Sequence, residues 1–261
     1  MRRLIRFDCE GARLAGTIDE APGRTGLLIL SGGNEIRIGA HRGMAKLAAE
    51  IAAAGHPVLR FDRRGIGDSE GANGGFHSSG PDIAAAVAAF RAACPAIDRI
   101  VAFGNCDAAS ALVLHRIAGI DALLLANPWV IERADDLPAP AAIRAHYWSR
   151  LRDPRALIGL FTGAIDLGKL ARGVLRVARS QEKSSLSQSV ADGIAQFPGA
   201  VSVLLASRDG TAIAFAEEWA RPHFAEARKC AKIEKIDSAS HSFASAEDYR
   251  ALKTLILEML A

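Results

Sequence analysis

Short apolar runs alternate along this chain with longer segments that have helical character. The runs contain four to six residues and are mostly apolar on both alternating faces, as in strands buried within a parallel sheet. The expected strands are Gly26–Leu30, Pro57–Phe61, Ile100–Phe103, Ala122–Ala126, Val201–Ala206 and Ala231–Ile236.

Alanine-rich or amphipathic segments lie between most of these strands and predict helices. Near the N-terminus, Ile5–Cys9 and Arg13–Thr17 alternate around Glu10-Gly11, which indicates an antiparallel hairpin. Strands that alternate with helices predict an α/β fold, with a mostly parallel central sheet and helices on both faces. The expected helices are Ala40–Ala54, Asp82–Ala93, Ala108–Ile117, Thr211–Arg221 and Ser245–Leu260.

The alternation stops between residues 132 and 190. Prolines at 138, 140 and 154 separate short helical stretches, and no convincing strand occurs there. The sequence therefore predicts a core of residues 1–131 and 191–261, interrupted by a helical insertion at 132–190.

Composition narrows the function classes. The 261 residues carry a net charge of +3 and are 50% hydrophobic, so a large core is expected and a nucleic-acid-binding surface is not. Four cysteines lie far apart, with no CxxC pair and no metal-ligand spacing, which favours a reducing compartment over a disulfide framework. Neither a metal nor another cofactor is expected. No apolar run approaches the ~20 residues of a membrane span, and the N-terminus lacks a signal-like apolar core. A cytoplasmic location is expected.

Candidate chemistry begins at the turn after the strand Ile100–Phe103. There Gly104-Asn105-Cys106-Asp107-Ala108 leads directly into a helix, in the pattern of a nucleophile elbow. Small residues at 104 and 108 allow a tight bend, and a helix N-terminus favours thiolate over thiol at Cys106. The alternative is an inert buried cysteine, which is the common state of this residue type.

Two further residues occur downstream in the order expected for nucleophile, acid and histidine. Asp209 follows the strand Val201–Ala206, and His241 lies in the loop before the last helix. His241 would take the thiol proton and Asp209 would orient the imidazole. Asp62 precedes the nucleophile and is expected to form a structural turn. Asp237 comes before the last loop and is the weaker candidate orienter.

An acyl-transfer site also needs donors for the developing oxyanion. The backbone N–H groups of Asp107 and of Gly33, in Gly32-Gly33-Asn34, are the expected pair, although these glycines also fit a plain tight turn. The remaining expected substrate contacts are Asn34, His41, Arg42 and Asn105.

With these residues in place, the sequence resembles the α/β-hydrolase superfamily and, more narrowly, the exosortase A system-associated hydrolase 1 family. The resemblance is carried by Asp209, His241 and four stretches of sequence. It implies a bacterium that makes exopolysaccharide and sorts proteins to its envelope, and it implies no particular substrate. Cysteine replaces the usual serine, and Ala108 replaces the second glycine of Gly-x-Ser-x-Gly. The stretches are Gly32-Gly33, Gly39-Ala40-His41-Arg42, Arg60–Gly71 and Gly104-Asn105-Cys106-Asp107-Ala108-Ala109-Ser110.

The leading hypothesis is an enzyme that cleaves a small ester or thioester through an acyl-cysteine. The alternatives are an acyltransferase with the same residues and a non-catalytic binding module on a hydrolase scaffold.

The insertion is expected to form a lid, because it follows the strand next to the elbow. Basic residues outnumber acidic ones between 144 and 183. One interpretation of this excess is a helix face exposed to solvent. The other is that the basic residues attract an anionic acyl donor, or bind peripherally to an anionic lipid surface.

Overall fold

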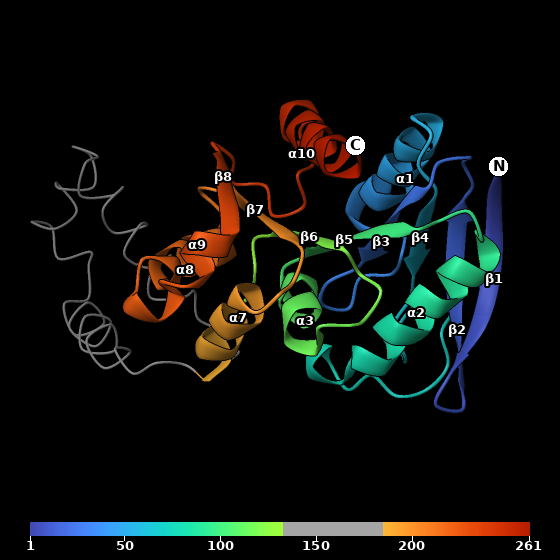
Figure 1. The fold of residues 1–261 in the computed structure, drawn as a ribbon, viewed down its shortest axis with the longest axis horizontal. Helices are drawn as coiled ribbons and strands as arrows, with labels where there is room; N and C mark the ends of the chain where they lie inside the picture. Colours follow the sequence, from blue (N-terminus) through green and yellow to red (C-terminus); the bar gives the residue numbers. More distant parts are fainter. Residues whose placement is uncertain (133–184) are drawn as a thin grey trace, which may run out of the picture.

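The computed structural model describes residues 1–132 and 185–261. In this part of the chain a single sheet has the strand order β1-β2-β4-β3-β5-β6-β7-β8 (Figure 1). The strands are β1 (Arg2–Cys9), β2 (Ala12–Asp19), β3 (Thr25–Leu30), β4 (Val58–Phe61), β5 (Arg99–Asn105), β6 (Ala122–Ala126), β7 (Ala200–Ala206) and β8 (Ala231–Ile236).

Strand direction matches the expectation from sequence. β1 pairs antiparallel with β2, and β2 pairs antiparallel with β4. Every later pairing, from β4–β3 through to β7–β8, is parallel. The carboxyl ends of β3, β5, β6, β7 and β8 therefore meet at one edge, where ligand sites of open α/β sheets form. The predicted fold class, a mostly parallel sheet between helices, is confirmed.

Helices cover both faces of the sheet (Figure 1). α1 (Gly43–Ala53) and α10 (Ala246–Leu260) lie on one face. The other face carries α2 (Gly80–Ala93), α3 (Asp107–His115) and α7 (Ser185–Ala195). The shorter elements are α8 (Gly210–Trp219), α9 (Ala227–Cys230) and the 3-10 turns η1 (Ala40–Arg42), η2 (Phe76–Ser78) and η3 (Pro222–Phe224).

The central strand β5 shows why its sequence is apolar throughout. Ile100 and Ala102 pack into the core on the α2–α3 face, whereas Val101 and Phe103 pack under α1 and α10. All four side chains are at most 1% exposed. Because successive side chains of a strand point to opposite faces, a strand covered on both sides has no position left for a polar residue.

α7 crosses residue 190, the predicted end of the insertion. Its side chains Leu186, Val190 and Ile194 are buried in the same core cluster as Val113 of α3. In sequence α7 thus begins inside the predicted insertion, but it packs with the sheet-covering layer. Residues 133–184, which include most of the predicted lid and its basic segment, lie outside the described residues, so the lid stays a prediction.

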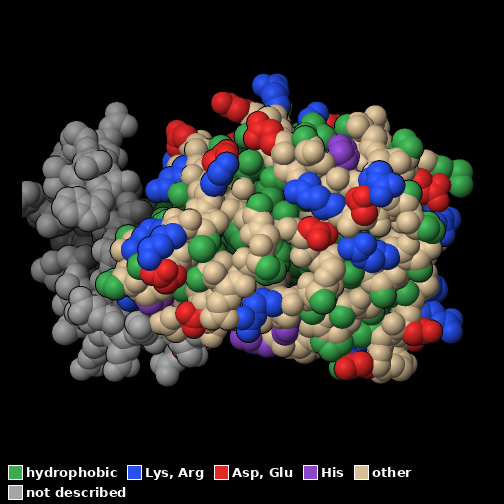
Figure 2. Space-filling model, viewed as in Figure 1, with side chains coloured by type: hydrophobic (Ala, Val, Ile, Leu, Met, Phe, Trp, Pro, Cys, Tyr) green, Lys and Arg blue, Asp and Glu red, His purple; other side chains and the backbone are tan. Residues whose placement is uncertain are grey.

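The surface carries charges of both signs. On the face seen in Figure 2, Lys and Arg side chains are intermixed with Asp and Glu. Within residues 1–132 and 185–261, none of the helices combines the length and apolar character that crossing a bilayer requires.

Candidate active site

The strand–turn–helix predicted around Cys106 is present between β5 and α3. Cys106 adopts φ 62° and ψ −127°, a strained conformation for a residue other than glycine. A Cβ atom at Gly104 would lie 2.7 Å from the carbonyl carbon of Ala108, so this bend requires glycine at 104. The Cys106 N–H donates to the Ala126 carbonyl over 2.9 Å, and its carbonyl accepts from Trp129 over 3.2 Å. These contacts hold a half-buried cysteine at the carboxyl edge of the sheet.

The predicted acid and histidine lie together at the same edge. Nδ1 of His241 is 3.1 Å from Oδ2 of Asp209. Asp209 caps the N-terminus of α8, and the same Oδ2 accepts the backbone N–H groups of Thr211 and Ala212, both over 3.1 Å. Capping of α8 therefore holds the Asp209 carboxylate in the position from which it pairs with the imidazole.

Electrostatics favour a charged histidine. The pKa of His241 is raised to about 10, first by its hydrogen bond to Asp209 and next by a hydrogen bond to Cys106. Burial raises the pKa of Asp209, but hydrogen bonds and charge from His241, together with the two N–H groups of α8, outweigh burial and lower that pKa overall. Asp209 therefore stabilises the imidazole in its protonated form, and Cys106 adds to this effect.

Two asparagine amides hold the histidine loop. Nδ2 of Asn105 donates to the His241 carbonyl over 2.9 Å, and Nδ2 of Asn127 donates to the same carbonyl over 3.3 Å. Oδ1 of Asn127 accepts the Ala206 N–H over 2.9 Å. Asn105 was expected to contact substrate, which stays a prediction, whereas its observed contact positions His241. Sequence reasoning missed Asn127. Its available signal is a polar residue that directly follows an apolar strand, at the edge where Cys106 and Asp209 lie.

The two expected oxyanion donors lie next to each other, but one of them is occupied. The Gly33 N–H donates to Oδ1 of Asp107 over 2.5 Å. The guanidinium of Arg63 donates to the Gly33 carbonyl, and its Nη2 is 3.8 Å from Oδ2 of Asp107. Arg63 is 5% exposed, and sequence reasoning had assigned its segment only to a structural turn. Gly33 therefore faces the elbow as expected, with the carboxylate of Asp107 as its acceptor.

The other predicted contacts lie around this loop. Asn34 is exposed and accepts a hydrogen bond from Asn73 over 2.9 Å. His41 and Arg42 are exposed, with φ of 52° and 61°, just before α1. Their role as substrate contacts stays a prediction.

The competing carboxylates have other partners. Asp62 is fully buried and accepts the backbone N–H of Arg37 over 2.5 Å as well as its guanidinium, which fits the expected structural role. Asp237 pairs with Arg208 over 2.9 Å.

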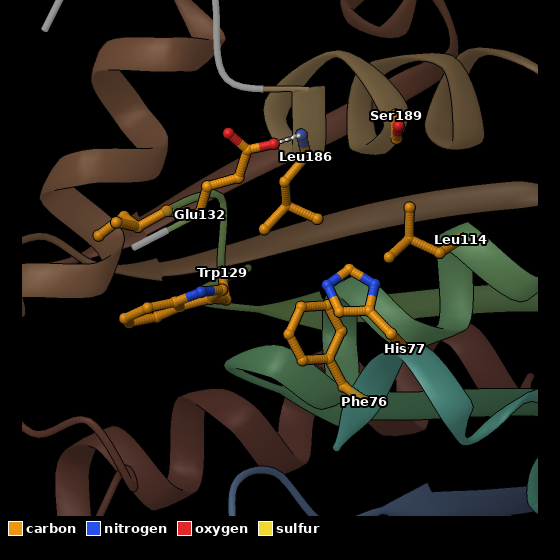
Figure 3. Close-up of a pocket in the computed structure, with 8 residues that line it drawn as sticks. Phe76, His77, Leu114, Trp129, Glu132, Leu186 and Ser189 are labelled. Atoms are coloured by element: carbon orange, nitrogen blue, oxygen red, sulfur yellow. Dashed lines mark hydrogen bonds between the residues drawn. The ribbon is translucent and has the colours of Figure 1, made fainter. Parts of the chain in front are cut away.

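A pocket of about 430 Å³ is lined by Leu114 of α3, by Leu186 and Ser189 of α7, and by Glu132. In Figure 3 the rings of Trp129 and Phe76 and the side chain of Leu186 surround it. Glu132 accepts the Leu186 N–H over 3.1 Å at one side. The described lining includes none of the predicted catalytic residues. Trp129 connects it to the elbow through its hydrogen bond to Cys106.

No protein-family model and no curated protein matches the sequence. The structure, however, is similar to many solved ones. It is similar to an esterase of Pyrococcus furiosus (TM-score 0.65, 16% identity, 99% of this chain and 92% of that chain covered). It is also similar to an esterase of Exiguobacterium antarcticum (TM-score 0.62, 13% identity, 98% of each chain). A third similar structure is the thioesterase domain from the curacin biosynthetic pathway (TM-score 0.58, 12% identity, 99% of each chain). Together with the strand order and the elbow between β5 and α3, these similarities show that the chain has the α/β-hydrolase fold.

Proposed function

We propose that the protein is a cysteine-dependent hydrolase that cleaves a small ester or thioester through an acyl-enzyme on Cys106. The observation that carries this proposal is the placement of His241, whose Nδ1 lies 3.1 Å from Oδ2 of Asp209 at the sheet edge that also holds Cys106 at the elbow. Cys106 also contributes to the raised pKa of this imidazole. The three residues come from three separate loops of the same sheet edge. A structural cysteine would need neither the elbow conformation nor a histidine partner.

The chemistry follows from the protonation state of His241. With a pKa of about 10, the imidazole is protonated at neutral pH, and an imidazolium is the partner that a cysteine nucleophile generally uses. The thiolate attacks the carbonyl carbon, the sulfur–carbon bond forms, and the carbonyl electron pair moves onto oxygen. His241 then protonates the departing alkoxide or thiolate as the tetrahedral intermediate collapses. A water molecule, deprotonated by the now neutral His241, adds to the thioester carbonyl carbon. Collapse of this second tetrahedral intermediate breaks the sulfur–carbon bond, releases the acid, and leaves the thiolate beside the protonated His241.

The similar structures support the reaction class, because two are described as esterases and one as a thioesterase domain. The four cysteines are free, which fits an intracellular thiol enzyme in the cytoplasm. The link to exosortase and exopolysaccharide systems rests on the sequence resemblance alone.

The proposal is tested with p-nitrophenyl esters and acyl thioesters of increasing chain length. We expect Cys106→Ala to lower kcat/KM for the best substrate by at least about a thousandfold. Cys230→Ala, which removes an exposed thiol away from the site, is the control and should leave the rate unchanged. Wild-type turnover by Cys106→Ala would overturn the proposal.

The acceptor distinguishes hydrolysis from transfer. The same reactions are repeated with alcohol or amine acceptors, and the products are separated. We expect free acid to remain the main product. A dominant acceptor ester or amide would instead assign acyl transfer to the same residues.

A further inference from the structure

The carboxylate of Asp107 lies where the expected oxyanion site should be open. Its Oδ1 accepts the Gly33 N–H over 2.5 Å. A Cβ atom added at Gly32 would lie 2.9 Å from this Oδ1 and 3.4 Å from Cβ of Cys106. The carboxylate oxygen and the nucleophile's side chain therefore border the same small space between the β3 loop and the elbow.

The second expected oxyanion donor is the backbone N–H of Asp107 itself. Asp107 is the first residue of α3, so its backbone N–H has no acceptor within the helix and points out of the helix N-terminus. An oxyanion bound to Cys106 would need this N–H and that of Gly33 together. One of the two is already hydrogen-bonded to a negatively charged group.

Arg63 stabilises the carboxylate in this position. Its side chain is 5% exposed, donates to the Gly33 carbonyl, and approaches Oδ2 of Asp107 to 3.8 Å. Among the described residues its Nη1 is buried without a hydrogen-bond partner. A buried cation that lacks part of its hydrogen bonding gains most from a nearby anion, and Asp107 is the carboxylate paired with it.

We propose that Asp107 is an internal cap of the oxyanion hole, so that its carboxylate takes the hydrogen bond needed by the reacting carbonyl oxygen. This inference rests on the proposed function. A neutral carbonyl is a weaker acceptor than a carboxylate and does not displace it, whereas the charged oxygen of a tetrahedral adduct competes with it. The Asp107 carboxylate therefore keeps the substrate carbonyl from the Gly33 N–H until negative charge has developed on its oxygen. This lowers the rate of acylation.

The test compares two reactions of the same sulfur. A trifluoromethyl ketone adds to Cys106 as the sulfur–carbon bond forms and the carbonyl electron pair moves onto oxygen, so its adduct needs the oxyanion hole. Iodoacetamide alkylates the sulfur by displacement of iodide and forms no oxyanion. We expect Asp107→Ala to tighten the ketone inhibition constant at least about tenfold, because one oxyanion donor is worth a large factor. The alkylation rate, compared at its high-pH plateau, should change less than about threefold.

Glu35→Gln is the matched charge control. Glu35 lies in the same loop and its charge interacts with both His241 and Asp107. If removal of a nearby negative charge were the whole effect, Glu35→Gln would also tighten the ketone, whereas the cap predicts an unchanged inhibition constant. Asp107→Asn keeps the shape of the side chain with a weaker acceptor and should give a smaller gain than alanine. It also decides the test if Asp107→Ala does not fold.

Unchanged or weaker ketone binding in the folded Asp107 variants would overturn the cap and make Asp107 a support of the loop. Equal gains in Glu35→Gln and Asp107→Ala would also overturn it. The proposed function fails by a different result, which is wild-type ester turnover in Cys106→Ala. The cap hypothesis can therefore fail while the protein is still a cysteine-dependent hydrolase, so the two failures are distinguishable.

Discussion

The two halves of the site are built differently. On the histidine side, Oδ2 of Asp209 pairs with the imidazole and accepts two backbone N–H groups, and two amides donate to the His241 carbonyl. On the elbow side Cys106 has a strained backbone, the Gly33 N–H is occupied by Asp107, and Arg63 has an unpartnered Nη1 among the described residues. Under the proposed mechanism, proton transfer is therefore pre-organised, whereas oxyanion binding is opposed by the Asp107 carboxylate.

The largest effect should come from breaking the histidine side at Asp209. Asp209→Asn removes the charge that stabilises the imidazolium, so we expect kcat/KM to fall by about 10³ to 10⁴. The pKa of His241 should fall from about 10 toward its ordinary value. Steady-state kinetics and NMR titration of the imidazole measure the two effects. Asp237→Asn, which removes an exposed carboxylate paired with Arg208, is the control. Equal losses in both variants would contradict the assignment of the acid.

The elbow side can be broken at its glycine. Gly104→Ala places a Cβ atom 2.7 Å from the Ala108 backbone, and we expect it to lower the free energy of unfolding by about 2–3 kcal/mol. Gly43→Ala is the control, because nothing lies within 4 Å of its Cβ and its φ of −58° is helical. That variant should be neutral or more stable by about 0.5–1 kcal/mol. Urea unfolding compares the three proteins, and a tolerated Gly104→Ala would show that the bend is not tight.

A smaller effect is expected from Asn127, which links the histidine side to β7. Asn127→Ala removes three side-chain hydrogen bonds, with the His241 carbonyl, the Ala206 N–H and Oδ1 of Asn105. We expect kcat/KM to fall by about ten- to a hundredfold, with a stability loss of about 1–3 kcal/mol. Asn127 has φ 41°, so alanine at this position loses the amide and also adopts a backbone conformation that disfavours it. Asn127→Gly separates these two causes, because glycine lacks the amide but adopts this φ without strain. Equal activity losses in both variants support the amide as the cause. Wild-type activity in Asn127→Gly would assign the effect to the backbone.

The smallest expected effect is on pH-dependent stability, because solvent screens the His241 side chain, which is 41% exposed. The pKa of His241 rises from 6.5 when unfolded to about 10 when folded, so folding takes up a proton between these values. Its stabilising contribution is complete below about pH 6.5 and is lost as pH rises toward 10. Thermal unfolding from pH 6 to pH 10, with His241→Gln as the control, measures the difference. A gap between the two proteins that widens with pH would contradict the sign.

Much of the fold was predictable because buried parallel strands have a local signature. Runs such as Ile100–Phe103 and Ala122–Ala126 are apolar on both faces, and their order with the helices fixed the fold class. Element ends were less predictable. The helix expected from Ala40 begins as α1 at Gly43, because His41 and Arg42 adopt positive φ without any glycine signal.

The candidate site was also only partly predictable from the sequence. Chain order pointed to Cys106, Asp209 and His241, because each follows a strand of one sheet edge. The contact of Asp107 with Gly33 joins residues 74 positions apart, and the contact of Asn127 with His241 spans 114. Such contacts depend on how loops close over the sheet, which no local pattern encodes.

The most direct test of the central claim is the mass of the enzyme during turnover. A p-nitrophenyl ester is mixed with the protein, the reaction is stopped in acid within the first turnover, and the digested peptides are measured. We predict one added acyl group on the peptide that contains Cys106, absent from Cys106→Ala. Full turnover without this adduct, or an acyl group on another residue that turns over at the same rate, would contradict the account.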